Sequence, residues 1–246
     1  MGNRADWQPL VDAGLGTYTC LAIDLPGHGE AVSWASNDWS FAAVVKAVIA
    51  SCDTHNVKRI IPVGYSMGGR IALYLAHAFP ERCAGLVLES ASPGLRTNAE
   101  RAARRRLDSE RAERIQAQPF AEFLADWYAM PLFASLHRFP DRFALMHARR
   151  LRNDAAALAR ALIALGTGEQ PSLWERLPTL GVATLALSGA LDTKFVRIGA
   201  EMAALAPRLQ HRIIQDAGHI VHIEQPVAFC SHLSSFIDQL YADGYR

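Results

Sequence analysis

The stretch IIPVGYSMGGR, residues 60–70, decides the fold of this chain. An apolar run with β-branched residues leads into a Gly-x-Ser-x-Gly turn, and residues 71–76 continue with apolar side chains at helical spacing. A strand, a sharp turn and a helix in this order form a nucleophile elbow. Because the turn is strained, we expect Gly64 and Gly68 to let the strand and helix backbones pass closely.

The elbow predicts roles for two groups. It lifts the Ser66 hydroxyl clear of the sheet, and it points the Met67 backbone N–H at an oxygen bound above the turn. The alternative is an ordinary Gly-rich turn whose serine caps the helix. The pentapeptide alone leaves both interpretations open, so the choice depends on partners elsewhere in the chain.

Composition indicates a globular chain with one sizeable core, since 50% of the 246 residues are hydrophobic and 20% are charged. A net charge of +1 gives no field that recruits nucleic acid or a membrane surface. The four cysteines lack metal-ligand spacing, and Cys20 and Cys83 lie in apolar runs, which predicts reduced core residues. We expect a cytoplasmic protein, a monomer or weak homo-oligomer, with no metal and no nucleic-acid or membrane partner.

Strand-like and helix-like segments alternate along most of the chain. This pattern predicts a mostly parallel sheet with helices on both faces, an α/β fold. From 93 to 171 the apolar spacing is helical only, which predicts a helical lid inserted into a core of residues 1–92 and 172–246. Besides the elbow strand, the expected strands are 18–23, 84–89, 182–187 and 210–214; the expected helices are 39–53, starting near Asn37 or Asp38, 196–205, and a last one from about 225.

Three polar residues each follow a predicted strand directly: Ser66, Asp192 and His219. Because parallel strands end at one edge of the sheet, we expect these side chains to meet there and form one hydrogen-bonded array. Their order along the chain is that of an α/β-hydrolase triad. His28, between two glycines, is expected to position a loop.

Several further stretches strengthen this interpretation. They are DLPGHG (24–29), PGL (93–95), ADWY (125–128), PLFASL (131–136), DTKF (192–195) and GHIVHIEQP (218–226). With these stretches, the elbow and the Asp–His pair, the chain resembles the 2-succinyl-6-hydroxy-2,4-cyclohexadiene-1-carboxylate synthase family, a menaquinone-pathway branch of the α/β-hydrolase superfamily.

The resemblance implies a lyase without a cofactor, which eliminates pyruvate from the small tricarboxylate 2-succinyl-5-enolpyruvyl-6-hydroxy-3-cyclohexene-1-carboxylate in vitamin K2 biosynthesis. Ser66, activated by His219, takes the proton beside the succinyl ketone, and Asp192 fixes the imidazole tautomer. An oxyanion hole that includes the Met67 N–H stabilises the charge on the ketone oxygen. Serine acts as a base in this role, and no acyl-enzyme need form.

The resemblance also nominates Arg70, Arg104 and Arg150 as carboxylate clamps, with Tyr65 and Trp127 lining the pocket. The planar fork of arginine suits this task because it binds a carboxylate bidentately.

The register of two of these arginines stays open by one position, because Arg104 lies in the run 104–106 and Arg150 has arginine neighbours at 149 and 152. Arg111 alternates with acids such as Asp108, which predicts a solvated helix face and makes Arg111 a silent control. Lys194 and Phe195 are expected only to shape a loop, and His222 to be structural.

Two other functions compete with the lyase. A hydrolase of esters or carbon–carbon bonds would use Ser66 as a nucleophile, and an apolar lid without arginines would favour it. A noncatalytic ligand-binding protein would be favoured by loss of a triad member, but all three residues are present.

The start of the chain carries a separate expectation. Residues 1–7 resemble the stretch that follows a strand ending in His-Gly in this superfamily, and that strand and its oxyanion loop are absent from the sequence. We expect Met1 to be an internal methionine and the sheet to lack a central strand. The alternative is that the backbone of residues 1–7 folds over the site and supplies the second oxyanion donor.

Overall fold

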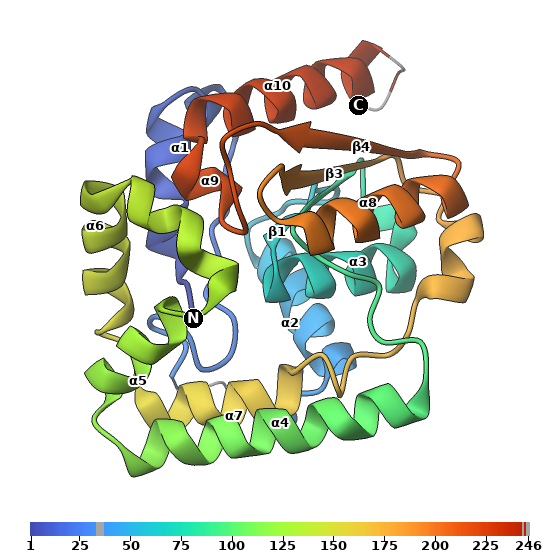
Figure 1. Cartoon of the computed structure of the whole chain (residues 1–246). Helices are drawn as coiled ribbons and strands as arrows, with labels where there is room; N and C mark the ends of the chain where they lie inside the picture. The colour runs from blue at the N-terminus through green and yellow to red at the C-terminus, as the bar shows by residue number, and fades with distance from the viewer. Residues whose placement is uncertain (33–36, 243, 245–246) are drawn as a thin grey trace.

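Four parallel strands in the order β1-β2-β3-β4 form the centre of the structure (Figure 1). The computed structural model describes residues 1–32, 37–242 and 244. Every residue of β2 and β3 is buried, as expected for a parallel sheet covered on both faces. The strands are β1 Val63–Tyr65, β2 Leu86–Glu89, β3 Thr184–Gly189 and β4 Leu209–Ile214.

Helices cover both faces because successive strand residues point to opposite sides. Leu86 and Leu88 of β2 pack into a core with α2 (Phe41–Thr54), α3 (Met67–Ala78) and α8 (Thr193–Leu205). Val87, between them, packs into a second core with α1 (Gln8–Asp12) and α10 (Pro226–Ala242). The predicted helix 39–53 begins later than expected, at Phe41, because Ser40 caps it by accepting a hydrogen bond from the Ala43 N–H at 3.2 Å.

The segment between β2 and β3 is helical in the described structure, as its spacing predicts. Figure 1 shows these helices curving around the end of the sheet where the strands finish. Within the described ranges no helix is both long and apolar enough to cross a membrane. The segment comprises α4 Asn98–Ala117, α5 Phe120–Tyr128, η4 Pro131–Arg138, α6 Pro140–Arg150, α7 Ala155–Leu165 and η5 Trp174–Thr179. The remaining short elements are η1 Arg4–Asp6, η2 Leu15–Thr17, η3 Pro80–Arg82 and α9 Val221–Glu224.

The turn from β1 into α3 depends on Gly64 and Gly69, whereas the sequence predicts Gly64 and Gly68. A Cβ on Gly64 would lie 2.4 Å from the Gly68 backbone, and one on Gly69 would lie 2.5 Å from the Ala91 Cβ. A Cβ on Gly68 would meet nothing within 4 Å, so the predicted need for glycine there is wrong. The rotation of the helix explains why glycine is needed at 69 and not at 68. The Cβ position of Gly68 points away from β1, whereas that of Gly69 points at Ala91, just beyond β2.

The expected buried strand over residues 18–23 is a second correction. The segment has no regular secondary structure, and residues 19–22 are exposed. Cys20 is exposed too, so the prediction that it fills the core is wrong, whereas Cys83 is buried as expected. An apolar run becomes a strand only when a neighbouring strand pairs with its backbone, and no described strand lies beside this one.

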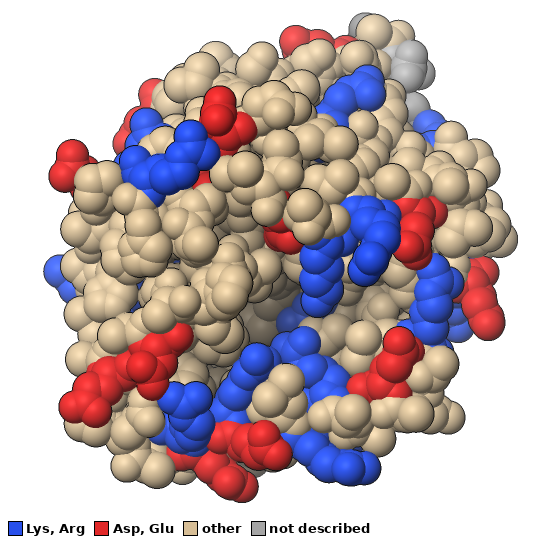
Figure 2. Space-filling view, viewed as in Figure 1, with Lys and Arg blue, Asp and Glu red and all other residues tan. Residues whose placement is uncertain are grey.

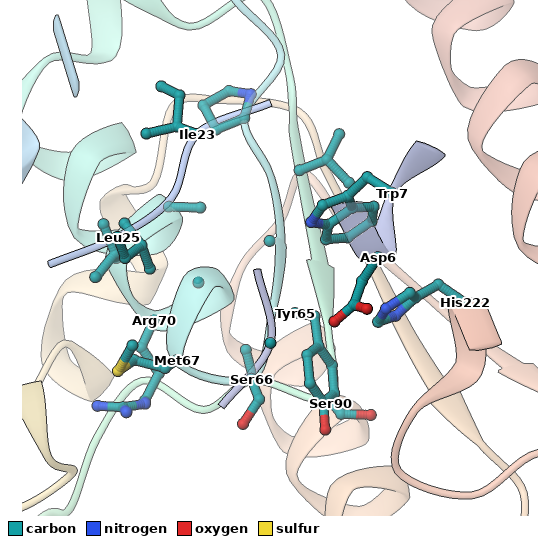
Figure 3. Close-up of a pocket in the computed structure, with 18 of the residues that line it drawn as sticks. Asp6, Trp7, Ile23, Leu25, Tyr65, Ser66, Met67, Arg70, Ser90 and His222 are labelled. Carbon is teal, nitrogen blue, oxygen red and sulfur yellow. The ribbon is translucent and has the colours of Figure 1, made fainter. Parts of the chain in front are cut away.

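A cavity of about 1310 Å³ lies beside β1 and separates it from the 18–25 segment. In Figure 3 Ile23 and Leu25 stand on one wall and Trp7 on the other. The Val87 N–H donates to Pro62 O, and the Ser66 N–H donates to Glu89 O. The backbone groups of the even-numbered residues from 62 to 66 therefore face β2. The backbone groups of Ile61, Val63 and Tyr65 therefore face the cavity. The expectation of a further strand at this place stays a prediction.

The elbow packing gives a test of stability. Gly64→Ala should lower the free energy of unfolding by ~3 kcal/mol or more, since its Cβ would collide with backbone that cannot move aside. Gly68→Ala should be neutral or slightly stabilising, because alanine is the better helix former in an open position. Urea denaturation of both variants measures the difference. Equal midpoints would show that the close approach is not what constrains the turn.

The space beside β1 gives a second test. Extending the chain at Met1 with an in-frame strand of about seven alternating apolar residues should raise its melting temperature, about 2–4 °C for each ~1 kcal/mol gained. The extension should also raise solubility, because it pairs exposed backbone and covers apolar walls. The control extension has serine at each apolar position. If both extensions leave the melting temperature unchanged, the cavity does not accept a strand.

Candidate active site

Ser66 stands at the sharp turn between β1 and α3 with a strained backbone. Its φ of 48° and ψ of −106° lie in a region that non-glycine residues rarely adopt. Two backbone hydrogen bonds hold it there, from Ser66 N to Glu89 O at 2.8 Å and from Arg70 N to Ser66 O at 3.0 Å. The side chain makes no capping bond to the helix, so the alternative of a capping serine is wrong. The hydroxyl instead lines the cavity.

Asp192 and His219 form the expected pair behind Ser66. The His219 Nδ1 lies 2.6 Å from Asp192 Oδ2, and both residues are buried. The other carboxylate oxygen, Oδ1, accepts from the Phe195 N–H at 3.2 Å and so caps α8. This double use fixes the carboxylate, and the bond to Nδ1 leaves Nε2 as the nitrogen that can take a proton from serine.

The prediction of one continuous array holds for only one of its two bonds. Asp192 and His219 are bonded, but Ser66 Oγ has no hydrogen bond to His219 in the part of the chain that the structure describes. All three residues nevertheless come from strand ends at one edge, and Ser66 and His219 line the same cavity. Such bonds are often long in enzymes without substrate and shorten when it binds.

Aromatic rings enclose the imidazole of His219 on three sides. The ring centroids of Tyr65, Phe133 and Phe195 lie 5.4, 5.9 and 4.8 Å from it. Phe133 comes from the lid element η4 and Phe195 from α8, so core and lid both contact the imidazole. This apolar wall limits the orientations of the ring and keeps water from it.

The Met67 N–H has no acceptor in the described structure, and its role as an oxyanion donor stays a prediction. Met67 is the first residue of α3 and lines the cavity beside Ser66. Gly2 and Asn3 line the same cavity, and their backbone N–H groups are also without acceptors in the described chain. The alternative that the N-terminal backbone supplies a second donor therefore stays open.

Arg70 is a buried cation at the centre of the site. It follows Ser66 by one helical turn and is 9% exposed. Burial, and then the charge of Arg104, lower the pKa of Arg70 to about 9. Its Nη1 donates to Leu165 O at 2.8 Å, and no carboxylate in the described chain pairs with it. An anion bound in the cavity would offset this charge.

Arg104 and Arg111 share one buried acid on α4. Arg104 Nε lies 2.8 Å and Arg111 Nη1 3.6 Å from Asp108 Oδ1, and Asp108 is 2% exposed. Both arginines line the cavity, whereas Arg105 turns to Gly168 O at 3.0 Å. Arg104 thus reaches the cavity and Arg105 does not, while the role of Arg104 as a carboxylate clamp stays a prediction. The prediction of a solvated face for Arg111 and Asp108 is wrong, because this face of α4 turns inward.

Arg150 is the most enclosed of the three nominated arginines. It is 2% exposed, hydrogen-bonds Tyr128 Oη, and lies 3.2 Å from Asp6 Oδ2. Burial lowers the pKa of Arg150, but Tyr128, Asp6 and Tyr65 more than offset this and raise it. The Nε is buried without a partner in the described chain, and the side chain lines the cavity.

A second carboxylate–imidazole pair lies at the pocket wall, where His222 lines the cavity. Glu89 and His222 are both buried, and the His222 Nδ1 lies 2.8 Å from Glu89 Oε2. Trp7 stacks on His222 with ring centroids 4.7 Å apart, and Tyr65 contacts the edge of the same ring at 5.1 Å. His222 is thus structural, as expected. It holds Tyr65 and the N-terminal segment in place.

The surface around the cavity carries positive charge. Figure 2 shows a hollow with Lys and Arg side chains on both sides of it. Trp127 also lines the cavity, so every nominated substrate-binding residue does.

Residue patterns do not identify three residues that position arginines in the site, namely Asp6, Asp108 and Tyr128. A buried acid between basic residues has no signature in a single sequence, although Asp108 lies four residues after Arg104, the spacing of a helical ion pair.

Comparison with known proteins agrees with this site. Residues 1–226 match the alpha/beta hydrolase fold family. The 2-succinyl-6-hydroxy-2,4-cyclohexadiene-1-carboxylate synthase of Serratia proteamaculans (strain 568) is 38% identical over 238 residues, which cover 96% of this chain and 89% of that protein. The solved structure of MenH from S. aureus superposes with a TM-score of 0.93 and 34% identity, covering 98% of this chain and 91% of that one.

A thermophilic esterase from Thermogutta terrifontis, solved with malate bound, superposes less closely. Its TM-score is 0.81 at 25% identity, over 97% of this chain and 86% of the esterase. The higher similarity to the synthases extends over almost the whole chain, lid included. The chain therefore belongs to the 2-succinyl-6-hydroxy-2,4-cyclohexadiene-1-carboxylate synthase family of the α/β-hydrolase fold.

Proposed function

We propose that this protein eliminates pyruvate from 2-succinyl-5-enolpyruvyl-6-hydroxy-3-cyclohexene-1-carboxylate, giving 2-succinyl-6-hydroxy-2,4-cyclohexadiene-1-carboxylate in menaquinone biosynthesis. The observation that carries the proposal is the meeting of a strained serine and a bonded Asp–His pair with arginines from core and lid in one cavity. The same proposal places the enzyme in the cytoplasm as a monomer or weak homo-oligomer.

The reaction begins with removal of a proton from the carbon beside the succinyl ketone. Ser66 Oγ takes this proton while His219 Nε2 accepts the hydroxyl proton of the serine, and Asp192 stabilises the imidazolium that forms. Negative charge moves to the ketone oxygen, where the Met67 N–H stabilises it. The electron pair then shifts through the ring double bond and breaks the C–O bond to the enolpyruvyl group, which departs as the enolate of pyruvate. This enolate takes up a proton at its methylene carbon to give pyruvate, and loss of the abstracted proton returns His219 to its neutral form. No covalent bond to serine forms.

The three carboxylates of the substrate form ion pairs with arginines on the walls of the cavity. Arg70 approaches from the elbow helix, Arg104 from α4 and Arg150 from the end of α6. Because Asp108 and Asp6 each hold an arginine from one side, the guanidinium groups are oriented before substrate arrives. Tyr65 and Trp127 supply apolar surface for the ring between them.

The rival hydrolase uses the same Ser66, Asp192 and His219, and the similarity to an esterase fold is the observation that favours it. Ester hydrolysis needs an acyl-enzyme and no cationic pocket. Assays with p-nitrophenyl esters beside the enolpyruvyl tricarboxylate separate the two functions. Dominant ester turnover would replace the proposal with a hydrolase, and saturable binding without turnover of either would indicate a receptor.

Variants of the triad test the mechanism. Ser66→Ala and His219→Ala should each lower the rate of pyruvate release by about 10³-fold or more, because the base or its activator is lost. The melting temperature of Ser66→Ala should change little, because the Ser66 side chain makes no hydrogen bond among the described residues. His219→Ala should also lower the melting temperature, because buried Asp192 loses its partner. Pyruvate release at near the native rate from Ser66→Ala would rule out serine as the base.

Variants of the arginines test the pocket. Arg70→Ala and Arg104→Ala should each cost ~2–5 kcal/mol in kcat/KM, because a desolvated carboxylate loses its partner. Arg104→Lys should recover only part of this, since the ammonium cannot bind bidentately. The matched control is Arg106→Ala, an exposed position on the same helix.

Arg150→Ala should behave differently from that pair. It should lower both activity and melting temperature, because it removes a partner of the buried Asp6. A loss for Arg106→Ala equal to that for Arg104→Ala would contradict the assigned register.

A further inference from the structure

The charges around the cavity do not cancel in the structure as described. Arg104 and Arg111 share Asp108, and Arg150 is paired with Asp6. Two other cavity-lining cations, Arg70 and Lys194, pair with no carboxylate in the described part of the chain. Arg70 is explained by the proposed function. Lys194, expected only to shape a loop, is not.

Lys194 occupies an electrostatically unfavourable position. It is the second residue of α8, where the positive end of the helix dipole disfavours a cation. It is exposed, with Nζ 5.5 Å from the centroid of the Phe195 ring. That ring packs against His219 at 4.8 Å, so Lys194 stands at the rim beside the catalytic imidazole. In the described chain no acid offsets its charge.

The lid contributes cations from another side. Arg104 and Arg111 reach the cavity from α4, whereas Lys194 reaches it from α8 in the core. Figure 2 shows basic side chains on both sides of the hollow. Like charges that face one cavity repel each other while it is empty, and a ligand with several negative charges relieves the repulsion.

We propose that Lys194 binds one carboxylate of a polycarboxylate ligand at the mouth of the cavity, beside the Phe195 ring that packs on His219. The inference rests on the proposed function for the identity of the substrate. An exposed ammonium on a flexible stem acts as a point charge, so it captures the anion and holds it without contacting the reacting carbon. It therefore contributes to KM and to the association rate, and little to kcat.

Steady-state pyruvate release tests this role. Lys194→Ala should raise KM about 3- to 10-fold with kcat within about twofold, and it should weaken the dependence of kcat/KM on ionic strength. Lys194→Arg should restore KM, and Lys194→Glu should raise it further than alanine does. The matched control is Arg197→Ala, an exposed cation on the same helix that does not line the cavity. A KM for Lys194→Ala equal to that of the control, or a loss confined to kcat, would overturn the proposal.

A binding measurement separates this inference from the proposed function. Titration of citrate, a tricarboxylate probe, into wild type and Lys194→Ala at low salt should show weaker binding to the variant by about the same factor. If wild type releases no pyruvate, the proposed function fails, but the citrate comparison still decides the role of Lys194. Equal affinity of the two proteins, including no measurable affinity for either, would overturn the inference.

Discussion

The contact between Gly64 and the first turn of α3 is the constraint on which the site depends. With no Cβ at Gly64, the backbone of Gly68 can lie against the end of β1. This approach forces Ser66 into a strained conformation, and backbone bonds to the neighbouring strand and helix hold it there. The same turn leaves the serine hydroxyl and the Met67 N–H directed at the cavity. The strain at Ser66, the position of its hydroxyl and the direction of the Met67 N–H thus have one cause.

The elbow also connects the core to the lid. Arg70, one turn beyond Ser66, donates to the carbonyl of Leu165 at the end of α7. Asp108 orders two arginines on the lid helix α4, and Asp6 orders Arg150 from the N-terminal segment. Because the chain itself holds these guanidinium groups, a bound carboxylate need not order them, and less conformational entropy is lost on binding. The lid is therefore a part of the binding site as well as its cover.

Residue patterns predict most of this arrangement because apolar runs bounded by turn residues mark β2 and β3 clearly, and a shorter, partly polar run marks β4. The order of Ser66, Asp192 and His219 after their strands then predicts the triad. Residue patterns give a wrong prediction where the structure of a segment depends on another segment that packs or pairs with it in three dimensions. The run 18–23 looks like a strand, but nothing described pairs with it, and Cys20 is exposed as a result. Likewise Arg104, Arg105 and Arg111 differ only by helical rotation, which decides which of them face the cavity.

The same three catalytic residues serve both an esterase and a lyase, so the difference between these functions must lie outside the triad. A serine activated by an imidazole attacks a carbonyl carbon when the substrate offers an ester, and removes a proton when the substrate offers an acidic C–H beside a ketone. In the proposed function, the charge of the pocket selects the second substrate. Arg70 from the elbow helix, and Arg104 and Arg150 from two lid helices, line the same cavity as Ser66, and a neutral ester gains nothing from these cations. Asp108 and Asp6 keep two of these cations in place, so in the proposed function two buried acids contribute to the choice of substrate by orienting the arginines.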